Sequence, residues 1–350
     1  MTPPNELDYF LSSYSYNYPP AQVAQQALPR GDSKVFIARR NQAIEVVSAK
    51  ELPQVLGSEF HLAANNTKVL PVRMLWHDPQ TGGKRELFFV RCLDPVANSW
   101  ECMVRPSKWF TPGKTFPLGD LVAKVVGNTE MGTKLIQMSA SAEDVFALMQ
   151  SHGAIPLPPY IRRQAQEEDK TRYQSVFASN AGSVAAPTAS LHFTDSMVQN
   201  WRSNQCWSEV TLHVGLGTFK SVETNDIRMH TMHQEHYVCS KSAADELNLA
   251  KSKGKKILAV GTTVCRVLEC CAKVPQKLEP GEGWTDIFIY PGYEWKFVDA
   301  LFTNFHQPQT TLIMLVASLW GREATLKMYN EAIDLKARLF SYGDAMLILP

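Results

Sequence analysis

The sequence lacks the features that mark a membrane-spanning or a secreted protein. It contains no run of about 18 apolar residues, and the longest apolar stretch, Leu312–Trp320, is too short to span a bilayer. The first residues, MTPPNELDYF, do not combine a basic start with an apolar core, as a secretory signal does. We therefore expect a protein of the cytoplasm that has no membrane partner.

Cysteine motifs and a strong net charge are also missing. The seven cysteines include no C-x-x-C pair, and their odd number in a long chain argues against a disulfide scaffold, so we expect reduced, buried thiols. The formal net charge is only +1, so composition neither indicates nor excludes a nucleic-acid partner. Lys251–Lys256 and Ile161–Arg163 are local basic segments, for which a solvated surface is the simpler interpretation.

A complete dinucleotide-binding loop is absent as well. In TLHVGLGTF, Gly215 and Gly217 supply the first glycine pair of the pattern G-x-G-x-x-G, but Lys220 occupies the third position. No helical pattern follows directly. His213 lies beside the two glycines, on an apolar, β-branched segment that predicts a buried strand.

The pattern of apolar and polar residues divides the chain into two kinds of region. From residue 69 to about residue 138, short alternating apolar runs recur between turn signals such as DPQTGGK and TPGK, which predicts a small all-β barrel or sandwich. Ser141, with Asp144 three residues later, fits a capping box at the start of a helix over 141–150. After this helix the pattern is α/β, so the simplest organisation is an α/β domain with a β domain inserted into it.

Within the α/β part, apolar β-branched runs predict buried strands, and longer periodic stretches predict helices. The expected strands are 210–214, 257–260, 287–290 and 312–316, and the expected helices lie near 172–177, 195–205, 243–253 and 322–338.

Histidine, threonine and glycine gather in short segments after residue 180. The histidines concerned are His192, His213, His230, His233 and His236. In VGTT a predicted strand ends and a helix begins at Thr262 and Thr263, so the backbone N–H groups of this turn can bind an anion. Because α/β folds bind ligands at the ends of their strands, these segments predict a polar cleft.

The same residues allow other interpretations. His192 alone fits a hydrogen-bonded core histidine. A metal-dependent hydrolase could use His230, His233 and His236, although their spacing of three differs from the spacing of four of a helical metal-binding pair. A non-catalytic tRNA- or protein-binding module that uses the β domain is a further alternative. Metal analysis would test the hydrolase, and a lack of cofactor turnover would indicate the binding module.

A series of longer strings resembles one family, the S-adenosylmethionine:tRNA ribosyltransferase-isomerases of the queuosine pathway. In chain order they are NNTKVLPVR (65–73), GAIPLPPYI (153–161), TASLHF (188–193), HVGLGTF (213–219), MHQE (232–235), AVGTTVCRVLE (259–269), IFIYPG (287–292), TNFHQPQTTLIMLV (303–316) and FSYGDAM (340–346). They extend over nearly the whole chain. TLHVGLGTF is therefore interpreted as part of this family's site and not as a dinucleotide loop.

The resemblance implies an activity. The ribosyl moiety of S-adenosylmethionine would be transferred and isomerised onto the 7-aminomethyl group of preQ1 at the wobble position of tRNA, giving epoxyqueuosine-tRNA, adenine and methionine. S-adenosylmethionine is then the ribosyl donor, no metal is required, and the partner of a monomeric enzyme is the anticodon loop of preQ1-containing tRNA.

The prediction for the fold class is mixed α/β. A large, barrel-like α/β catalytic domain would comprise residues 1–68 and 150–350, and residues 69–149 would form an inserted antiparallel β-barrel domain.

Family position and residue chemistry together assign a site. Histidine suits the proton transfers of this reaction because its pKa lies near neutral pH. The expected acid–base residues are His192, His213, His230 and His233, and Glu235 is expected to orient one of them. The expected binding residues are Asn65, Asn66, Thr67, Lys68, Thr188, Gly215, Gly217, Thr218, Thr262, Thr263, Arg266, Asn304, His306, Tyr342 and Asp344. Within this set, Thr262, Thr263 and Arg266 would hold the methionine carboxylate or a tRNA phosphate. His236 lies outside the matched strings and is expected to be dispensable.

Overall fold

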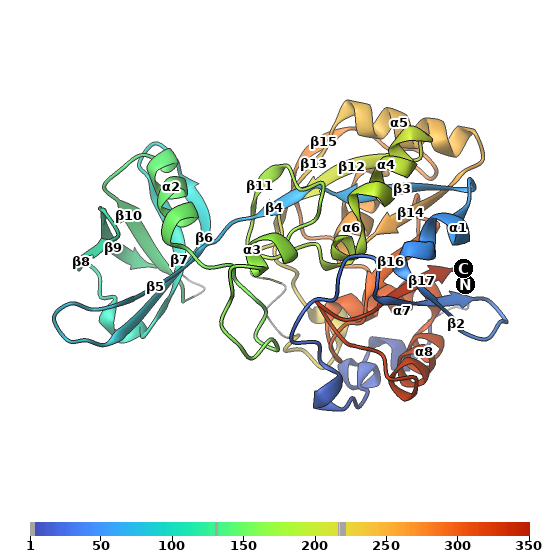
Figure 1. Ribbon diagram of the computed structural model, residues 1–350, viewed down its shortest axis with the longest axis horizontal. Helices are drawn as coiled ribbons and strands as arrows, with labels where there is room; N and C mark the ends of the chain where they lie inside the picture. The colour runs from blue at the N-terminus through green and yellow to red at the C-terminus, as the bar shows by residue number, and fades with distance from the viewer. Residues whose placement is uncertain (1–3, 130–131, 216, 218–221) are drawn as a thin grey trace.

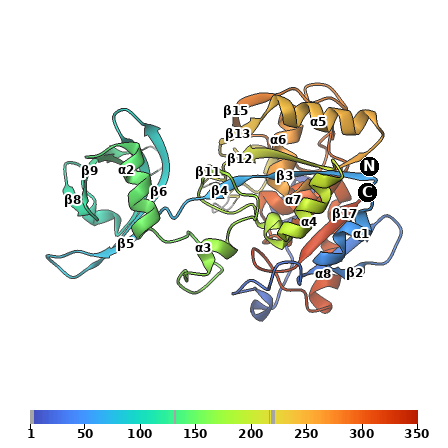
Figure 2. The same cartoon turned by 45° about the horizontal axis from the view of Figure 1, so that its top comes forward.

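The chain forms two lobes of different size. The computed structural model describes residues 4–129, 132–215, 217 and 222–350. In this part of the chain, a nine-stranded sheet organises the large lobe and a six-stranded antiparallel sheet the small lobe (Figure 1). The segments around β4 (Thr67–Val69), β11 (Asn180–Ser183) and α3 (Asp169–Arg172) lie between the lobes in both views (Figure 2). None of the helices described is both long and apolar enough to cross a membrane.

The large sheet has the strand order β15-β13-β12-β3-β14-β16-β17-β1-β2. Its central strands β12 (Trp207–Leu212), β3 (Phe60–Asn65), β14 (Lys256–Val260) and β16 (Ala300–Asn304) run parallel to one another. They are almost entirely buried, as is typical of parallel strands covered on both faces. The carboxyl ends of these four strands therefore share one edge of the sheet.

The remaining elements of the large lobe flank this centre. The outer strands are β13 (Glu235–Cys239), β15 (Gly281–Thr285), β17 (Ala345–Leu349), β1 (Lys34–Arg39) and β2 (Glu45–Ser48). The helices are α1 (Leu52–Leu56), α4 (Asp195–Ser203), α5 (Lys241–Ser252), α6 (Thr262–Cys271), α7 (Thr311–Trp320) and α8 (Arg322–Asp334). Short 3-10 helices are η1 (Glu6–Tyr9), η2 (Leu11–Tyr14), η3 (Pro20–Gln22), η4 (Ala49–Glu51), η6 (Thr188–His192) and η8 (Ile227–Met229).

Alternate residues of the central strands belong to two separate hydrophobic cores. Ala63 and Ala259 belong to the core that also contains α5, α6, α7 and α8, whereas their neighbours Leu62 and Leu258 belong to the core under α4 and α1. This division follows from the two-residue period of a strand, which points successive side chains to opposite faces. Helices thus cover both faces of the sheet, and the expected mixed α/β fold is confirmed.

The small lobe is one antiparallel sheet packed against a helix. Its elements are β5 (Arg73–His77), β6 (Lys84–Asp94), β7 (Ser99–Arg105), η5 (Ser107–Trp109), β8 (Thr115–Leu118), β9 (Leu121–Asn128), β10 (Lys134–Met138) and α2 (Ala142–His152). The predicted capping box starts α2, since the Asp144 N–H donates to the Ser141 hydroxyl at 3.2 Å. Val145 and Met149 of this helix share a core with Trp100 of the sheet.

Several predicted elements are wrong. The segment 312–316 is not a strand but part of α7, because the apolar run extends over ten residues and is long enough to form a buried helix. The segment 287–290 has no regular structure, and the strand β15 ends just before it, at Thr285. The helix near 172–177 is displaced, since α3 already ends at Arg172. The cysteines are free thiols, and five of the seven are buried as expected, whereas Cys92 and Cys270 are partly exposed.

Candidate active site

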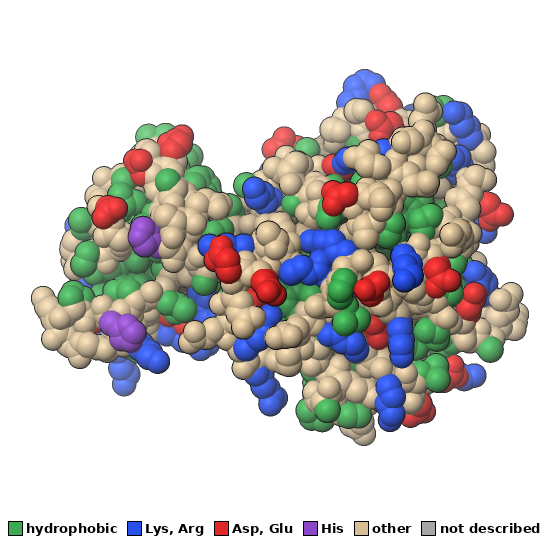
Figure 3. All heavy atoms as spheres, in the orientation of Figure 1, with side chains coloured by type: hydrophobic (Ala, Val, Ile, Leu, Met, Phe, Trp, Pro, Cys, Tyr) green, Lys and Arg blue, Asp and Glu red, His purple; other side chains and the backbone are tan. Residues whose placement is uncertain are grey.

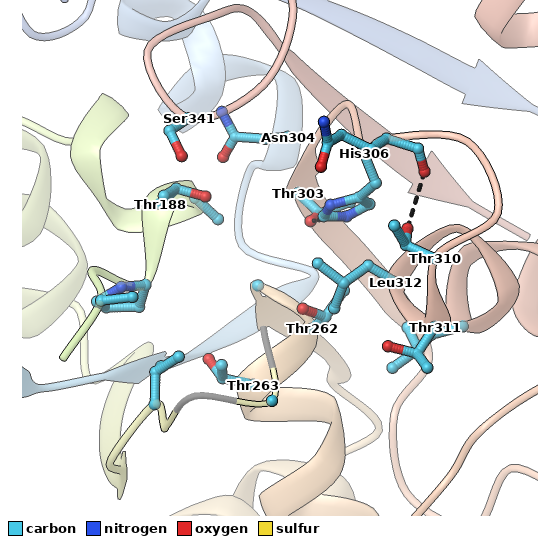
Figure 4. Close-up of a pocket in the computed structure, with 18 of the residues that line it drawn as sticks. Thr188, Thr262, Thr263, Thr303, Asn304, His306, Thr310, Thr311, Leu312 and Ser341 are labelled. Atoms are coloured by element: carbon cyan, nitrogen blue, oxygen red, sulfur yellow. Dashed lines mark hydrogen bonds between the residues drawn. The ribbon is translucent and has the colours of Figure 1, made fainter. Parts of the chain in front are cut away.

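A cavity of about 190 Å³ lies at the carboxyl ends of the parallel strands. Val214 lines it just after β12, Gly261 just after β14 and Phe305 just after β16. Side chains from η6, α6 and α7 surround the same space in Figure 4. This is the edge of the sheet where α/β folds place their ligands.

The structure brings only part of the predicted site to this cavity. The predicted residues that line it are Thr188, Gly217, His230, His233, Glu235, Thr262, Thr263, Arg266, Asn304 and His306. The predicted residues outside its lining are Asn65, Asn66, Thr67, Lys68, His192, His213, Gly215, Tyr342 and Asp344. Thr218 lies outside the described residues.

Glu235 and Arg266 form a buried ion pair in the cavity wall. Glu235 begins β13, and the guanidinium of Arg266, one turn into α6, donates to its carboxylate. The backbone N–H of Gly215 donates to the second carboxylate oxygen at 2.9 Å. Arg266 also donates to the carbonyl of Ile287 at 3.3 Å. The contacts that the structure shows for Glu235 thus join it to an arginine, whereas the sequence analysis expected a histidine.

The first turn of α6 is fixed against the sheet beside the cavity. Gly261 precedes the helix with φ +96°, a conformation that favours glycine. Asn65, at the end of β3, donates to the Thr263 hydroxyl at 3.2 Å and to the Leu212 carbonyl at 3.0 Å. Asn65 therefore joins β3, β12 and α6. The N–H groups at the start of a helix lack intrahelical partners, so this turn is suited to an anionic group.

Asn304 presents a buried acceptor to the cavity. Its amide nitrogen donates to the Phe340 carbonyl at 3.1 Å and contacts His192 Nε2 at 3.1 Å. Its amide oxygen is buried, has no hydrogen-bond partner in the described part of the chain, and faces the open space in Figure 4. Leaving a buried acceptor unpaired costs about 1–3 kcal/mol. A ligand that donates a hydrogen bond would therefore fit here.

His192 lies behind Asn304 and is buried. Its Nδ1 is 2.5 Å from the Ser33 hydroxyl oxygen, and its Nε2 contacts Asn304, so both ring nitrogens have partners within the protein. Burial lowers the pKa of His192 to about 4, which keeps the imidazole neutral at pH 7. His192 thus positions the Asn304 amide that lines the cavity.

His306 and His230 lie in the cavity wall itself. The Nε2 of His306 is 3.0 Å from the Thr303 hydroxyl oxygen, and burial lowers the pKa of this imidazole to about 3. The ring of His230 packs edge-on against Phe288 with 5.4 Å between centroids. Burial, and then the neighbouring His233, lower the pKa of His230. Both imidazoles are therefore neutral near pH 7.

His213 points to a different environment. Its Nδ1 is 2.8 Å from the Thr67 hydroxyl oxygen, and its ring stacks on His236 with 5.9 Å between centroids. Gly182 contacts the same ring so closely that an added Cβ would lie 2.8 Å from it. Burial lowers the pKa of His213. The ring is therefore packed between strands and does not line the cavity.

The other predicted residues outside the lining make structural contacts. Asn66 accepts a hydrogen bond from the Thr211 hydroxyl at 2.7 Å, and Lys68 is exposed. Tyr342 donates to Asp169 at 2.7 Å. Asp344 accepts the backbone N–H groups of Lys34 and Arg338 at 2.9 and 2.8 Å. The contacts of Asn66, Tyr342 and Asp344 thus join segments that are far apart in the sequence, and the Lys68 side chain has no such role among the described residues.

Sequence reasoning missed several lining residues. They are Tyr160, Phe288, Gln307, Thr310, Thr311, Phe340 and Ser341, among others. The seven residues named here lie in the strings GAIPLPPYI, IFIYPG, TNFHQPQTTLIMLV and FSYGDAM, so these strings contained the signal. Hydroxyl groups and aromatic rings also cap and pack, and residue type alone therefore did not distinguish them.

Comparison with known proteins identifies the family of this chain. Residues 11–348 match the family described as queuosine biosynthesis protein, and the chain belongs to this family. An S-adenosylmethionine:tRNA ribosyltransferase-isomerase from Symbiobacterium thermophilum is 44% identical over 97% of this chain and 99% of its own length. The enzyme of the same name from Desulforamulus reducens is 41% identical over the same shares.

A solved structure matches as well. The S-adenosylmethionine tRNA ribosyltransferase from Thermotoga maritima superposes with a TM-score of 0.54 at 30% identity, over 97% of this chain and 100% of that chain. The expected family and enzyme class are therefore confirmed. The hydrolase and binding-module alternatives find no support in these matches, and the described residues contain no group of His, Cys, Asp or Glu placed to hold a metal.

Proposed function

We propose that this chain transfers and isomerises the ribosyl moiety of S-adenosylmethionine onto the 7-aminomethyl group of preQ1 at the wobble position of tRNA. Adenine and methionine leave, and epoxyqueuosine-tRNA remains. The observation that supports the proposal most is the family match over nearly the whole chain, combined with a cavity that is lined largely by residues of the matched strings. S-adenosylmethionine is a substrate of the reaction, and tRNA is the acceptor.

Two histidines in the cavity wall are our first candidates for acid–base groups. The sulfonium of S-adenosylmethionine acidifies the adjacent C5′ protons, so a neutral base can remove one of them, and the departing adenine needs a proton or a hydrogen bond. His230 and His233 line the cavity, and the pKa of His230 is lowered, which favours its neutral form. His192 and His213 lie outside the lining, and we assign them positioning roles through Asn304 and Thr67.

The binding roles follow from the polar groups of the wall. The first turn of α6, with Thr262 and Thr263, suits the methionine carboxylate, because its N–H groups point out of the helix. Arg266 is already paired with Glu235, so its role is to hold β13 against α6. The unpaired oxygen of Asn304 suits a donor such as the exocyclic amine of a purine.

The organisation of the chain completes the proposal. Residues 1–68 and 150–350 act as the catalytic domain, and residues 69–149 as an inserted barrel-like domain. The large domain is itself barrel-like, and the enzyme works as a monomer in the cytoplasm on the anticodon loop. Bases of a single-stranded loop can be splayed into a protein pocket, which is the way that RNA sequence is usually recognised.

One reaction tests this function. The chain is incubated with S-adenosylmethionine and preQ1-containing tRNA, and the small products and the tRNA nucleosides are analysed. We expect adenine, methionine and epoxyqueuosine, and none of them with tRNA that carries guanine at the wobble position. Formation of S-adenosylhomocysteine as the main product would show methyl transfer and contradict the proposal. Equal turnover of the free preQ1 base would contradict recognition of the anticodon loop.

A further inference from the structure

Two arginines line a small hollow beside His192, and a third arginine lies near the same imidazole. The hollow has a volume of about 20 Å³, and Arg30, Arg172, Ser33 and His192 are among its lining residues. Arg338 is near enough that its charge, like the charges of Arg30 and Arg172, lowers the pKa of His192. A single imidazole therefore separates this hollow from Asn304 in the cavity wall.

The hydrogen bonds of these arginines go to backbone carbonyls. Arg30 donates to the carbonyls of Leu191 at 3.0 Å and Thr171 at 2.9 Å. Arg172 and Arg338 each donate to a carbonyl of the segment 26–28. The Nη1 atom of Arg338 is buried and has no hydrogen-bond partner in the part of the chain that the structure describes. Carbonyl dipoles orient the three guanidinium groups but supply no net negative charge.

Carboxylates do not neutralise this cluster. Among the described residues, no ion pair involves Arg30, Arg172 or Arg338, whereas Arg163 and Arg322 each have a carboxylate within 2.8 Å. Acidic groups lie near the cluster but have other partners. Asp344 accepts two backbone N–H groups, and Asp169 pairs with Arg163 and accepts the Tyr342 hydroxyl. Asp195, in the first turn of α4, also acts on Arg30 through its charge.

The electrostatics of the cluster favour an anion. All three guanidinium groups are half-buried, and burial lowers the pKa of each. For Arg30, burial and the charge of Arg172 lower the pKa to about 10. Arg30 and Arg172 repel each other in a partly desolvated place, whereas the charge of Asp344 opposes the lowering of the Arg338 pKa, and a bound anion removes the cost of the repulsion. Guanidinium forks match the oxygen geometry of phosphate.

We propose that Arg30, Arg172 and Arg338 bind a backbone phosphate of the tRNA substrate, next to the nucleotide whose base enters the cavity. The inference rests on the proposed function, because it takes tRNA as the substrate. In Figure 3, Lys and Arg side chains lie beside Asp and Glu side chains in the middle of the face, where α3 lies in Figure 1. Arg30 and Arg172 are each partly exposed, so a large polyanion can reach them. The phosphate and the base are then held on the two sides of His192.

Binding of preQ1-containing tRNA as a function of salt tests the inference. Arg172→Gln and Arg338→Gln are compared with Arg39→Gln, an arginine of β1 that is paired with Glu45. One lost phosphate contact lowers the slope of log affinity against log salt by roughly 0.7–0.9. We expect this change in both variants, together with affinity about tenfold weaker, as for the loss of one charge-assisted hydrogen bond. The KM for tRNA should rise while the KM for S-adenosylmethionine stays constant, and Arg39→Gln should match the wild type.

Further measurements distinguish a tRNA phosphate from free inorganic phosphate as the ligand of the hollow. An unchanged salt slope in folded Arg172→Gln and Arg338→Gln would overturn the inference. A second result would also overturn it. Inorganic phosphate would raise the melting temperature of the wild type but not of Arg172→Gln, and both proteins would bind tRNA equally well. The hollow would then bind a free anion and not the tRNA. If the glutamine variants do not fold, Arg172→Lys keeps the charge and should keep the slope while binding tRNA more weakly. Failure of the proposed function would instead appear in the wild type, as missing adenine release.

Discussion

The two lobes differ in where their unpaired polar groups lie relative to the cavity. In the small lobe, Arg85 reaches Asp78 at 2.8 Å and Arg91 reaches Glu101 at 2.7 Å, so these arginines are neutralised within the lobe. Both lobes contain buried polar atoms without a partner in the described part of the chain. The Asn304 oxygen of the large lobe lines the cavity, whereas Arg85 Nε and Asn98 Nδ2 of the small lobe lie outside its lining. A folded protein tolerates such groups where a substrate supplies the missing partner. The comparison therefore agrees with the proposal that the large lobe recognises the substrate.

The largest difference between the lobes should appear when histidines are removed. His230→Ala and His233→Ala should each lower turnover by about 10² to 10⁴, which is the usual contribution of a positioned acid or base. His152→Ala, at the end of α2 in the small lobe, should keep nearly the full rate, because that side chain is exposed and far from the cavity. The measurement is single-turnover adenine release, with circular dichroism to verify folding.

A second control lies within the large lobe. His236 stacks on His213 and is 3.3 Å from Glu282 at the sheet edge, and it does not line the cavity. We expect His236→Ala to change turnover little. If the 230 and 233 variants both kept the wild-type rate, the base would have to be sought at His192 or His213, and the proposed division of roles would be wrong.

This distribution of roles shows what the sequence could and could not predict. The strings around Thr262 and Asn304 contain residues that line the cavity, because these strings include the carboxyl ends of the parallel strands β14 and β16. His192 and His213 have the same local signature as His230, yet their rings turn away from the cavity toward Ser33 and Thr67. Those partners lie more than a hundred residues away in sequence, so only the assembled sheet determines the direction of each ring.

The fold was predictable to a similar extent. The alternation of short strands marked the small lobe and the strand at 257–260 was found, whereas the predicted strand 210–214 only overlaps the end of β12. Parallel neighbours such as β3, β12 and β14 are far apart in sequence, and no local pattern encodes which strands pair. The segment 312–316 shows a further limit, because a short apolar run fits a buried strand and a buried helix equally well.

The next comparison concerns two ion pairs, one in each lobe. Glu235→Ala should lower the free energy of unfolding by about 3–5 kcal/mol, because it leaves the Arg266 charge buried without its partner. Glu86→Ala breaks the partly exposed pair with Arg73, and such pairs contribute only about 0–1 kcal/mol. Urea unfolding followed by circular dichroism gives both values. Similar losses for the two variants would show that the cavity wall does not depend on the buried pair.

Acid should destabilise the large lobe through its buried histidines. The folded-state pKa values of His61 and His192 are about 4, below the ordinary 6.5, so the unfolded chain binds more protons between these values. Stability is therefore complete above pH 6.5 and falls as the pH decreases toward 4, by about 1.4 kcal/mol per pH unit for each histidine.

His61 allows this prediction to be tested without touching the cavity. The Nε2 atom of His61 is 2.8 Å from the Ser208 hydroxyl oxygen. His61 lies near the start of β3, away from the carboxyl ends of the strands where the cavity is. Burial is the main cause of its lowered pKa, and the nearby Lys255 adds to it while Glu246 opposes it. His61→Gln should reduce the loss of unfolding free energy between pH 6.5 and 4 by the contribution of one histidine, which is about 1.4 kcal/mol per pH unit. Melting curves at several pH values measure this, and an unchanged pH dependence would exclude His61 as a contributor.

The smallest expected effect lies in the aromatic cluster of the small lobe. The ammonium of Lys114 is 3.6 Å from the ring centroid of Trp109, and the ring nitrogen of Trp109 donates to Asp78 at 2.9 Å. Lys114→Gln should lower the free energy of unfolding by roughly 0.5–1 kcal/mol, the usual size of an accessible cation–π contact. Lys108→Gln, an exposed neighbour in η5, should change it by less than about 0.5 kcal/mol. Because neither lysine belongs to the cavity or to the arginine hollow, both variants should release adenine at the wild-type rate with saturating tRNA. A slower release in Lys114→Gln would mean that the small lobe takes part in catalysis, and the contrast between the lobes would then have to be abandoned.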